Sequence, residues 1–256
     1  MTIHFYKYQA AGNDFVLIDN RNKDIDLSKE QIAKICHRRF GVGADGVILI
    51  ANDSQTNFNI TYINPDGSQS LCGNGSRTAV DLATRLGMTN GQISFNAYDG
   101  VHRAEILPDG QIKIQMNDVN AIEEVFEGYS LDTGSPHYVK FVSDLDNYPV
   151  FDEGRTMRYD KHFPKGTNAN YIEDKGGNVI ALRTYERGVE EETMACGTGA
   201  TAAALAASKN GYSSPITIFT KGGTLTVEFK LRPSGGFYDI YLTGPAKLVF
   251  EGDLEL

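Results

Sequence analysis

The 256-residue sequence has no tryptophan, only three cysteines and no long run of apolar residues. Cys36, Cys72 and Cys196 form no C-x-x-C pair and no even set, so neither a disulfide framework nor a closed zinc site is predicted. No apolar run approaches the ~18 residues of a membrane helix, and the N-terminus lacks a basic region followed by an apolar one. Basic residues are outnumbered by acidic ones, and the net charge of −9 argues against nucleic-acid and membrane partners. We therefore expect a cytoplasmic globular protein whose cysteine chemistry uses free thiols.

An internal repeat surrounds two of the cysteines. The segment around Cys72 reads SLCGNGSRTAV, and the segment around Cys196 reads MACGTGATAAA. The match extends upstream, because Gly12 precedes Cys72 by 60 residues and Gly134 precedes Cys196 by 62. Each copy predicts a thiol in a glycine-containing turn, then a helix, then strands closed by a hairpin.

The repeat predicts an α/β fold of the α+β type. We expect two pseudo-symmetric domains, each a mixed β-sheet wrapped around a central α-helix, with the active site in the cleft between them. The helices are expected to end at Gly87 and Gly211. The second helix is nearly all alanine and has no polar face, which favours burial. The predicted domains are 1–118 and 119–249, and the sequence leaves open whether the tail, 250–256, rejoins the first domain.

The two repeated thiols are the strongest candidates for chemistry. Cys72 and Cys196 each lie beside glycines at the predicted start of a helix, where backbone N–H groups and the helix dipole favour a thiolate. Cys36, in the helical pattern EQIAKICHRRF, is interpreted as a buried apolar residue. One thiol in each domain suits inversion at a carbon, because one group removes a proton and the other delivers a proton to the opposite face. The carboxylate of the carbanion would lie against the helix amides.

Two glycine-rich motifs resemble nucleotide sites but do not predict one. The segment GVGADG, residues 41–46, follows a helical pattern and opens an apolar run, whereas a dinucleotide fingerprint follows a strand and opens a helix. The segments CGNG and CGTG lack the Gly-Lys-Ser/Thr of a phosphate loop.

Polar residues near the thiols are weaker candidates. Glu186 and Arg187 lie about ten residues before the second thiol, and adjacent opposite charges are usually an exposed pair. Asn64 lies eight residues before the first thiol and could be only a turn residue. Their corresponding positions in the two repeats favour a functional interpretation. His137, Asn13 and Asn168 are individually weak signals.

Together these segments resemble diaminopimelate epimerases from residue 3 to about residue 245. The similarity lies in AGNDFVLID, GVGADG, NPDGSQSLCGNG, GSPHYV, FPKGTNANYI and YERGVEEETMACGTGA. It implies a cofactor-independent, metal-free isomerase that interconverts L,L- and meso-diaminopimelate for lysine and peptidoglycan precursor synthesis, and it suggests a homodimer. It also implies that Cys72 and Cys196 are the acid–base pair, assisted by His137 and Glu186. The residues implied to hold the substrate are Asn13, Asn64, Asn168, Glu186 and Arg187, with Gly73, Asn74, Gly197 and Thr198 at its reacting carboxylate.

Two positions depart from the family pattern. Gly46 stands where some members have glutamine, and Ser135 stands where many have asparagine. The shorter Ser135 would reach the distal end of the substrate through water, which affects affinity and not the reaction class.

Two alternatives remain. A proline or hydroxyproline racemase would have the same fold, but it typically shows Cys-Gly-His where this chain has Asn74. A thiol-based redox sensor would use the two cysteines in a reversible disulfide.

Overall fold

The computed structural model describes residues 2–22, 24–89, 91–233 and 235–256. They form two compact units, one made of Met1–Ile114 with Gly244–Leu256 and the other of Gln115–Thr243. Among these residues, no helix has both the length and the apolar character needed to span a membrane.

A mixed sheet forms the first unit around helix α2 (Gly73–Arg85). The strand order is β17–β1–β2–β3–β4–β5–β6–β7, in which β2–β3 and β4–β5 are parallel and the other neighbours are antiparallel. Helix α1 (Lys29–Cys36) connects the first parallel pair and α2 connects the second, as parallel neighbours require a crossover. The strands are β1 (Thr2–Ala10), β2 (Asn13–Asp19), β3 (Gly46–Ala51), β4 (Phe58–Ile63), β5 (Ile93–Ala97), β6 (Gly100–Ile106), β7 (Ile112–Gln115) and β17 (Lys247–Glu255).

The second unit repeats this plan around helix α4 (Gly197–Ala207). Its order is β8–β9–β10–β11–β12–β14–β15–β16, with β10–β11 and β12–β14 parallel and β13 paired to the end of β12. Helix α3 (Val150–Arg158) and α4 occupy the two crossovers, and the short 3-10 helices are η1 (Leu145–Asn147) and η2 (Ser208–Asn210). The strands are β8 (Glu123–Val125), β9 (Gly128–Asp132), β10 (Pro136–Phe141), β11 (Asn168–Gly176), β12 (Val179–Glu186), β13 (Glu191–Thr193), β14 (Ile216–Thr220), β15 (Gly223–Leu231) and β16 (Phe237–Gly244).

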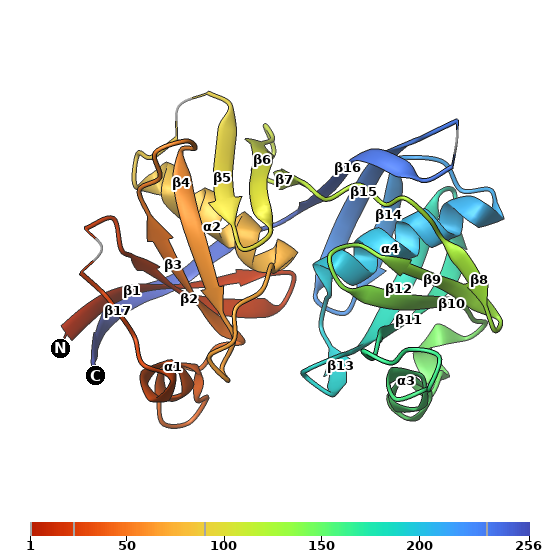
Figure 1. The fold of residues 1–256 in the computed structure, drawn as a ribbon, viewed down its shortest axis with the longest axis horizontal. Helices are drawn as coiled ribbons and strands as arrows, with labels where there is room; N and C mark the ends of the chain where they lie inside the picture. The colour runs from red at the N-terminus through yellow and green to blue at the C-terminus, as the bar shows by residue number, and fades with distance from the viewer. Residues whose placement is uncertain (1, 23, 90, 234) are drawn as a thin grey trace. The chain divides into compact units, whose positions relative to one another are not determined.

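Each central helix packs against the strands of its own unit (Figure 1). Helix α2 contacts β1–β4 and β17, and α4 contacts β9–β12, β14 and β15. Every residue of α4 except Thr198 is buried. Alanine and glycine side chains let the strands approach α4 on most sides, which explains why a helix without a polar face is stable here.

Both central helices end at the glycines predicted from the sequence. Gly87 follows α2 with φ +72°, and Gly211 follows η2 at the end of α4 with φ +89°. Glycine adopts this left-handed conformation without the penalty that a Cβ atom brings.

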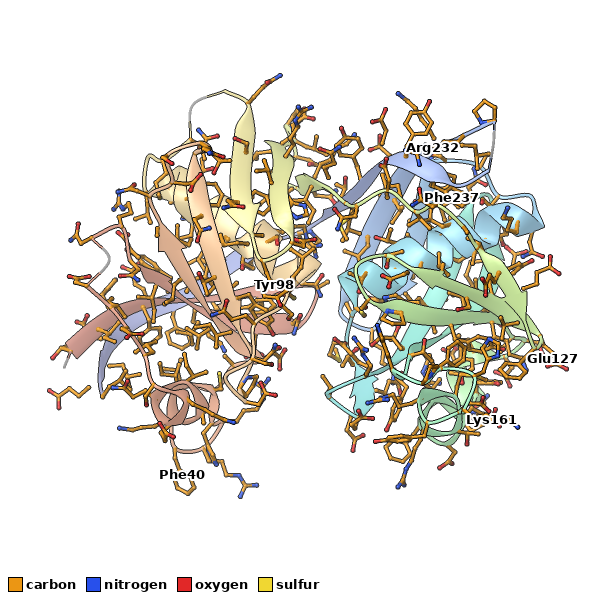
Figure 2. All side chains as sticks on the ribbon, in the orientation of Figure 1. Phe40, Tyr98, Glu127, Lys161, Arg232 and Phe237 are labelled. Carbon is orange, nitrogen blue, oxygen red and sulfur yellow. The ribbon has the colours of Figure 1, made fainter. Side chains whose placement is uncertain are left out.

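The chain enters the second unit before residue 118, where the sequence analysis placed the boundary. The backbones of Val119 and Phe237 exchange hydrogen bonds of 3.0 and 2.6 Å, and Arg232 forms an ion pair with Asp118. Figure 2 labels Arg232 and Phe237 on the last hairpin of this unit. Earlier in the chain, the Met116 N–H also donates to the Ile240 carbonyl of β16 at 2.8 Å, so the unit begins at Gln115.

The C-terminal segment belongs to the first unit from Gly244 onward, a longer stretch than the tail considered from the sequence. Strand β17 pairs antiparallel with β1 from Thr2 to Gln9. This pairing covers the edge that β1 would otherwise expose.

Candidate active site

Both repeated cysteines are N-cap residues of the central helices, where a side chain meets backbone N–H groups that have no helical acceptor. Cys72 precedes α2 and Cys196 precedes α4, each with an extended backbone. The Sγ atoms accept hydrogen bonds from the third helical residue, at 3.4 Å from Gly75 N and 3.4 Å from Gly199 N. The two units therefore hold their thiols in the same way.

The second glycine of each C-G-x-G segment allows close packing beneath the thiol. A Cβ atom on Gly75 would lie 2.9 Å from Ile48 Cδ1. A Cβ atom on Gly199 would lie 2.5 Å from Asn170 Oδ1 and 3.3 Å from the sulfur of Cys196. A larger residue would have to displace a terminal methyl group at Gly75 and a buried amide oxygen at Gly199.

The helix N-termini favour negative charge at the two sulfurs, because the aligned peptide dipoles place partial positive charge there. Cys72 is half-buried and Cys196 is 7% exposed. Cys36 differs, because it ends α1 inside a hydrophobic cluster and burial raises the pKa of its thiol to about 11. Its interpretation as a core residue is confirmed.

In the first unit, Asn13 and Asn74 meet at the thiol. Asn13 Oδ1 lies 3.8 Å from Cys72 Sγ and accepts a hydrogen bond of 3.2 Å from Asn74 Nδ2. Asn13 Nδ2 donates to the carboxylate of Asp45. Burial raises the pKa of Asp45, the charge of Asp14 adds to this, and the hydrogen bonds that Asp45 accepts oppose it. The structure thus brings together Asn13, Cys72 and Asn74.

Two further predicted residues of this unit are Gly73, at the start of α2, and Asn64, in the turn after β4. Gly73 is the buried first residue of α2. Asn64 follows β4, and its Nδ2 donates to Ser68 Oγ at 3.1 Å and to Ser70 Oγ at 3.3 Å. These bonds stabilise the turn after β4, so the structure supports the turn interpretation of Asn64 and leaves its substrate role as a proposal.

In the second unit, a hydroxyl takes the place of the asparagine amide beside the thiol. Thr198 Oγ1 lies 3.4 Å from Cys196 Sγ. The carbonyl of Thr198 accepts a hydrogen bond of 2.9 Å from Thr133 Oγ1, which anchors the first turn of α4 to the segment before β10. Gly197 is the buried first residue of α4.

His137 is fully buried and uncharged. Burial, together with the charge of Arg187, lowers the pKa of His137 to about 3. Asn170 Nδ2 donates to Nδ1 of the ring at 3.1 Å, and Thr184 Oγ1 fixes the orientation of this amide by donating to its Oδ1 at 2.9 Å. Because Nδ1 accepts, the ring proton is on Nε2, which donates to Ser135 Oγ at 3.0 Å. Near neutral pH, His137 is thus a neutral hydrogen-bond donor to Ser135, and its predicted role in assisting the thiols stays a prediction.

Asn168 connects this network to the end of β12. Its Nδ2 donates to Ser135 Oγ at 3.1 Å, and its Oδ1 accepts from the backbone N–H of Arg187 at 2.9 Å. Arg187 donates through its guanidinium to the Lys165 carbonyl at 3.0 Å. Glu186, the last residue of β12, and Arg187 are both half-buried, so they are not an exposed surface pair.

The structure explains one of the two departures from the family pattern. A Cβ atom on Gly46 would lie 2.3 Å from Cε2 of Tyr62, whose ring fills the space of a larger side chain. The hydroxyl of Tyr62 donates to the Asp45 carbonyl at 3.3 Å. Ser135 is the second departure, and it joins His137 to Asn168.

The sequence analysis missed two buried residues that belong to these networks. Asn170 is fully buried beside His137, and its alternation with Asn168 on one face of β11 was the signal that could have revealed it. Arg77 is fully buried and donates to Asn74 Oδ1 at 2.8 Å. Its spacing of three residues from Asn74 places both on one face of α2.

The polar groups at the two thiols are amides, hydroxyls and helix N–H groups. In the described part of the chain, no group of three or more histidine, cysteine or acidic side chains could hold a metal ion. N–H and O–H donors of this kind are suited to organic carboxylates.

Comparison with known proteins identifies the family. The diaminopimelate epimerase family model matches residues 5–122 and 129–249. The chain belongs to the diaminopimelate epimerase family. The diaminopimelate epimerase of Flavobacterium psychrophilum is 44% identical over 252 residues, covering 96% of this chain and 98% of that protein. The diaminopimelate epimerase of Aquifex aeolicus is 38% identical and covers 98% of both chains. The expected family and the isomerase class are confirmed, and this favours the epimerase over the racemase and redox-sensor alternatives.

Solved structures with much lower identity share the fold of this diaminopimelate epimerase family member. A phenazine biosynthesis protein of the PhzF family from Bacillus anthracis aligns with a TM-score of 0.78 at 15% identity, covering 100% of both chains. A hydroxyproline epimerase from Agrobacterium vitis aligns with a TM-score of 0.73 at 14% identity, covering 100% of this chain and 93% of that one. These matches confirm the mixed α/β class, which is rich in strands and has few helices.

Proposed function

We propose that this chain interconverts L,L- and meso-diaminopimelate without a cofactor, using Cys72 and Cys196 as the acid–base pair. The observation that carries this proposal is the matched N-cap geometry, in which a helix amide donates to each sulfur at 3.4 Å. Membership of the diaminopimelate epimerase family supports the choice of substrate.

In this mechanism, the two thiols act on opposite faces of one α-carbon. The thiolate of one cysteine removes the α-proton, and the thiol of the other delivers a proton to the opposite face. The reverse reaction exchanges their roles. This requires the N-termini of α2 and α4 to flank the substrate, which is the arrangement expected from the repeat.

The helix N-termini would also bind the reacting carboxylate. The first amides of a helix have no acceptor within the helix, and the dipole favours an anion there. Gly73 and Asn74 supply such amides in α2, and Gly197 and Thr198 supply them in α4. Negative charge that develops on the carboxylate as the α-proton leaves would be stabilised at the same groups.

The distal amino-acid end of the substrate would be held by Asn64, Asn168, Glu186 and Arg187. Glu186 offers a carboxylate for the ammonium group, and Arg187 offers a planar guanidinium for the carboxylate. Glu186 also assists proton transfer in this proposal, and Asn13 contacts both the substrate and Cys72. His137 contributes as a neutral donor that holds Ser135 in place.

We further propose a cytoplasmic homodimer. The dimer rests on the family resemblance alone, and sedimentation equilibrium of the purified chain tests it. The cytoplasmic location rests on the need for two reduced thiols in the reaction.

The decisive experiment follows hydrogen isotopes in deuterated water. The thiol that donates to the carbon exchanges with solvent before the substrate binds, while the thiolate removes protium from the other face. We expect deuterium at the inverted carbon of the first product formed from L,L-diaminopimelate, with the remaining substrate still protiated. Product that keeps most of its protium would refute two-base catalysis.

Cysteine variants assign the two bases. Cys72→Ala and Cys196→Ala should each abolish inversion. Cys36→Ala is the matched control, because this thiol lies in the hydrophobic core of the first unit. It should keep the isotope pattern of the unmodified chain.

A further inference from the structure

Arg77 is a buried cation with no acidic partner. Its side chain lies on α2 and is fully buried, and within the described residues it forms no ion pair with a carboxylate. A buried charge without a counter-ion destabilises a folded chain unless another group compensates for the lost hydration. We therefore expect the group that compensates for the charge of Arg77 to lie at the Cys72 site.

The guanidinium is directed toward the thiol site. Arg77 Nη2 donates to Asn74 Oδ1 at 2.8 Å, and Nε donates to the Pro245 carbonyl at 3.3 Å. The Nη1 group has no hydrogen-bond partner in the described part of the chain. Burial lowers the pKa of Arg77 to about 10, and negative charge on Cys72 acts in the opposite direction. Arg77 and the Cys72 thiolate thus stabilise each other's charged form.

The same arginine fixes two amide orientations. Arg77 can only donate, so it determines that Asn74 presents Oδ1 to it and Nδ2 to Asn13. The carboxylate of Asp45 accepts from Asn13 Nδ2 at the other end of the chain of hydrogen bonds. Asn13 Oδ1 is left facing Cys72 Sγ and accepts a hydrogen bond of 3.8 Å from the protonated thiol, so the charge of Arg77, and not this amide, favours the thiolate.

We propose that Arg77 is a positioning residue for Cys72, which orients Asn74 and Asn13 and whose buried charge keeps the Cys72 thiolate populated. This rests on the proposed role of Cys72 as one of the two bases. It adds a difference between the two thiols that the repeat alone does not predict.

The central helix of the second unit has no buried cation equivalent to Arg77. Thr201 occupies the position in α4 that Arg77 occupies in α2, and its hydroxyl donates to the Gly197 carbonyl at 3.1 Å. Helix α4 contains no charged residue, and it is described throughout. Cys196 is therefore held by its helix amides and Thr198, without a cation from its own helix.

Apart from the half-buried Tyr6, the other ionisable groups on the elements packed against α2 are paired or exposed. Lys7 and Arg38 both bind Asp14, and Arg38 also binds Asp45. The Tyr8 hydroxyl donates to Asp81 of α2 at 2.7 Å. The remaining groups on these strands are His4, Tyr6, Asp19 and Tyr62, and the charged residues of β17 are Lys247, Glu251, Asp253 and Glu255. All four charged residues of β17 are exposed, Asp19 pairs with Arg21, and β3 contains no ionisable residue.

Alkylation by iodoacetamide tests the proposal without depending on turnover. The rate of modification of the Cys72 peptide is measured by mass spectrometry from pH 5 to pH 10, and the Cys196 peptide in the same sample is the internal reference. Arg77→Gln keeps a donor for Asn74 but removes the charge. We expect its pH midpoint for Cys72 to rise by about one pH unit, with no change at Cys196. Arg77→Lys keeps the charge and should keep the midpoint.

Arg85→Gln is the matched control, because Arg85 lies on the same helix, is exposed and pairs with Asp81. The pH midpoint for alkylation of Cys72 and the turnover number should both be unchanged in Arg85→Gln. An unchanged Cys72 midpoint in Arg77→Gln, or equal shifts at both cysteines, overturns the proposal. If Arg77→Gln does not fold, Arg77→Lys is the deciding variant. A pH midpoint of Cys72 alkylation that rises although the charge is present overturns the proposal. An unchanged midpoint with a lowered kcat supports the proposal. A failure of the isotope experiment would leave these midpoints unaffected, so the two proposals are tested separately.

Discussion

Alanine at Gly199 is expected to damage this protein far more than alanine at Gly75, although the two glycines occupy equivalent positions in the repeat. Both are third residues of a central helix, and both amides donate to a cysteine sulfur. The difference lies beneath them. The new Cβ at position 75 would meet the terminal methyl group of Ile48 at 2.9 Å, whereas at position 199 it would meet Oδ1 of Asn170 at 2.5 Å.

The structure sets the size of each effect. In Gly199→Ala, the buried Asn170 must move and lose its bond from Thr184, which costs about 1–3 kcal/mol, and overpacking adds about 1–3 kcal/mol. The better helix propensity of alanine returns about 1 kcal/mol, which leaves about 1–5 kcal/mol of destabilisation. In Gly75→Ala, movement of a terminal methyl group costs about 1 kcal/mol and the helix gain is about equal, so the net change is near zero.

Urea unfolding and steady-state kinetics of the two variants measure these effects. Because the new methyl at position 199 also lies 3.3 Å from Cys196 Sγ, kcat of Gly199→Ala should fall by about 10- to 100-fold, while Gly75→Ala keeps most of its activity. Equal stability losses, or a larger loss in Gly75→Ala, would refute the reasoning about what lies under each thiol.

Two further predictions concern the second unit. Arg187→Ala should lower kcat/KM, mainly by raising KM, with a loss of transition-state stabilisation of about 2–4 kcal/mol. Arg187→Lys should recover only part of this loss, because lysine lacks the planar guanidinium. Unchanged kinetics in Arg187→Ala would show that Arg187 does not bind the substrate. Because the pKa of His137 is lowered to about 3, the unfolded chain binds a proton between pH 6.5 and 3 that the folded chain does not. The free energy of unfolding should therefore fall by up to about 1.4 kcal/mol per pH unit below 6.5, and less steeply in His137→Gln. Urea unfolding of both chains at pH 7 and pH 5 checks this. An equal loss of unfolding free energy in the two chains between these pH values would contradict it.

The repeat could be predicted because its signals are local. The C-G-x-G segments, the alanine-rich helix and the terminal glycines Gly87 and Gly211 depend on hydrogen bonding within a few residues. The domain boundary was harder to predict from the sequence. It depends on contacts between segments far apart in sequence, such as the bond from the Met116 N–H to the Ile240 carbonyl.

The roles of individual polar residues depended on packing between distant segments. The sequence did not reveal that His137 is completely buried, that burial lowers its pKa, or that its ring donates to Ser135. Gly46 looked like a missing polar side chain, but the ring of Tyr62 occupies its space. Neither outcome could be derived from neighbours along the chain.

The family, the paired thiols and their place at the starts of two helices could be predicted from the amino-acid sequence. Those features follow from motif spacing and from the chemistry of helix termini, which are written in short segments. The burial of Arg77 and its connection to Cys72 through Asn74 could be seen only in the folded chain, as could the hydrogen bond of the neutral Thr201 at the equivalent position of α4. The physical reason is that burial, which decides whether a charge is screened by water or acts on its neighbour, is a property of the packed chain and not of any one segment.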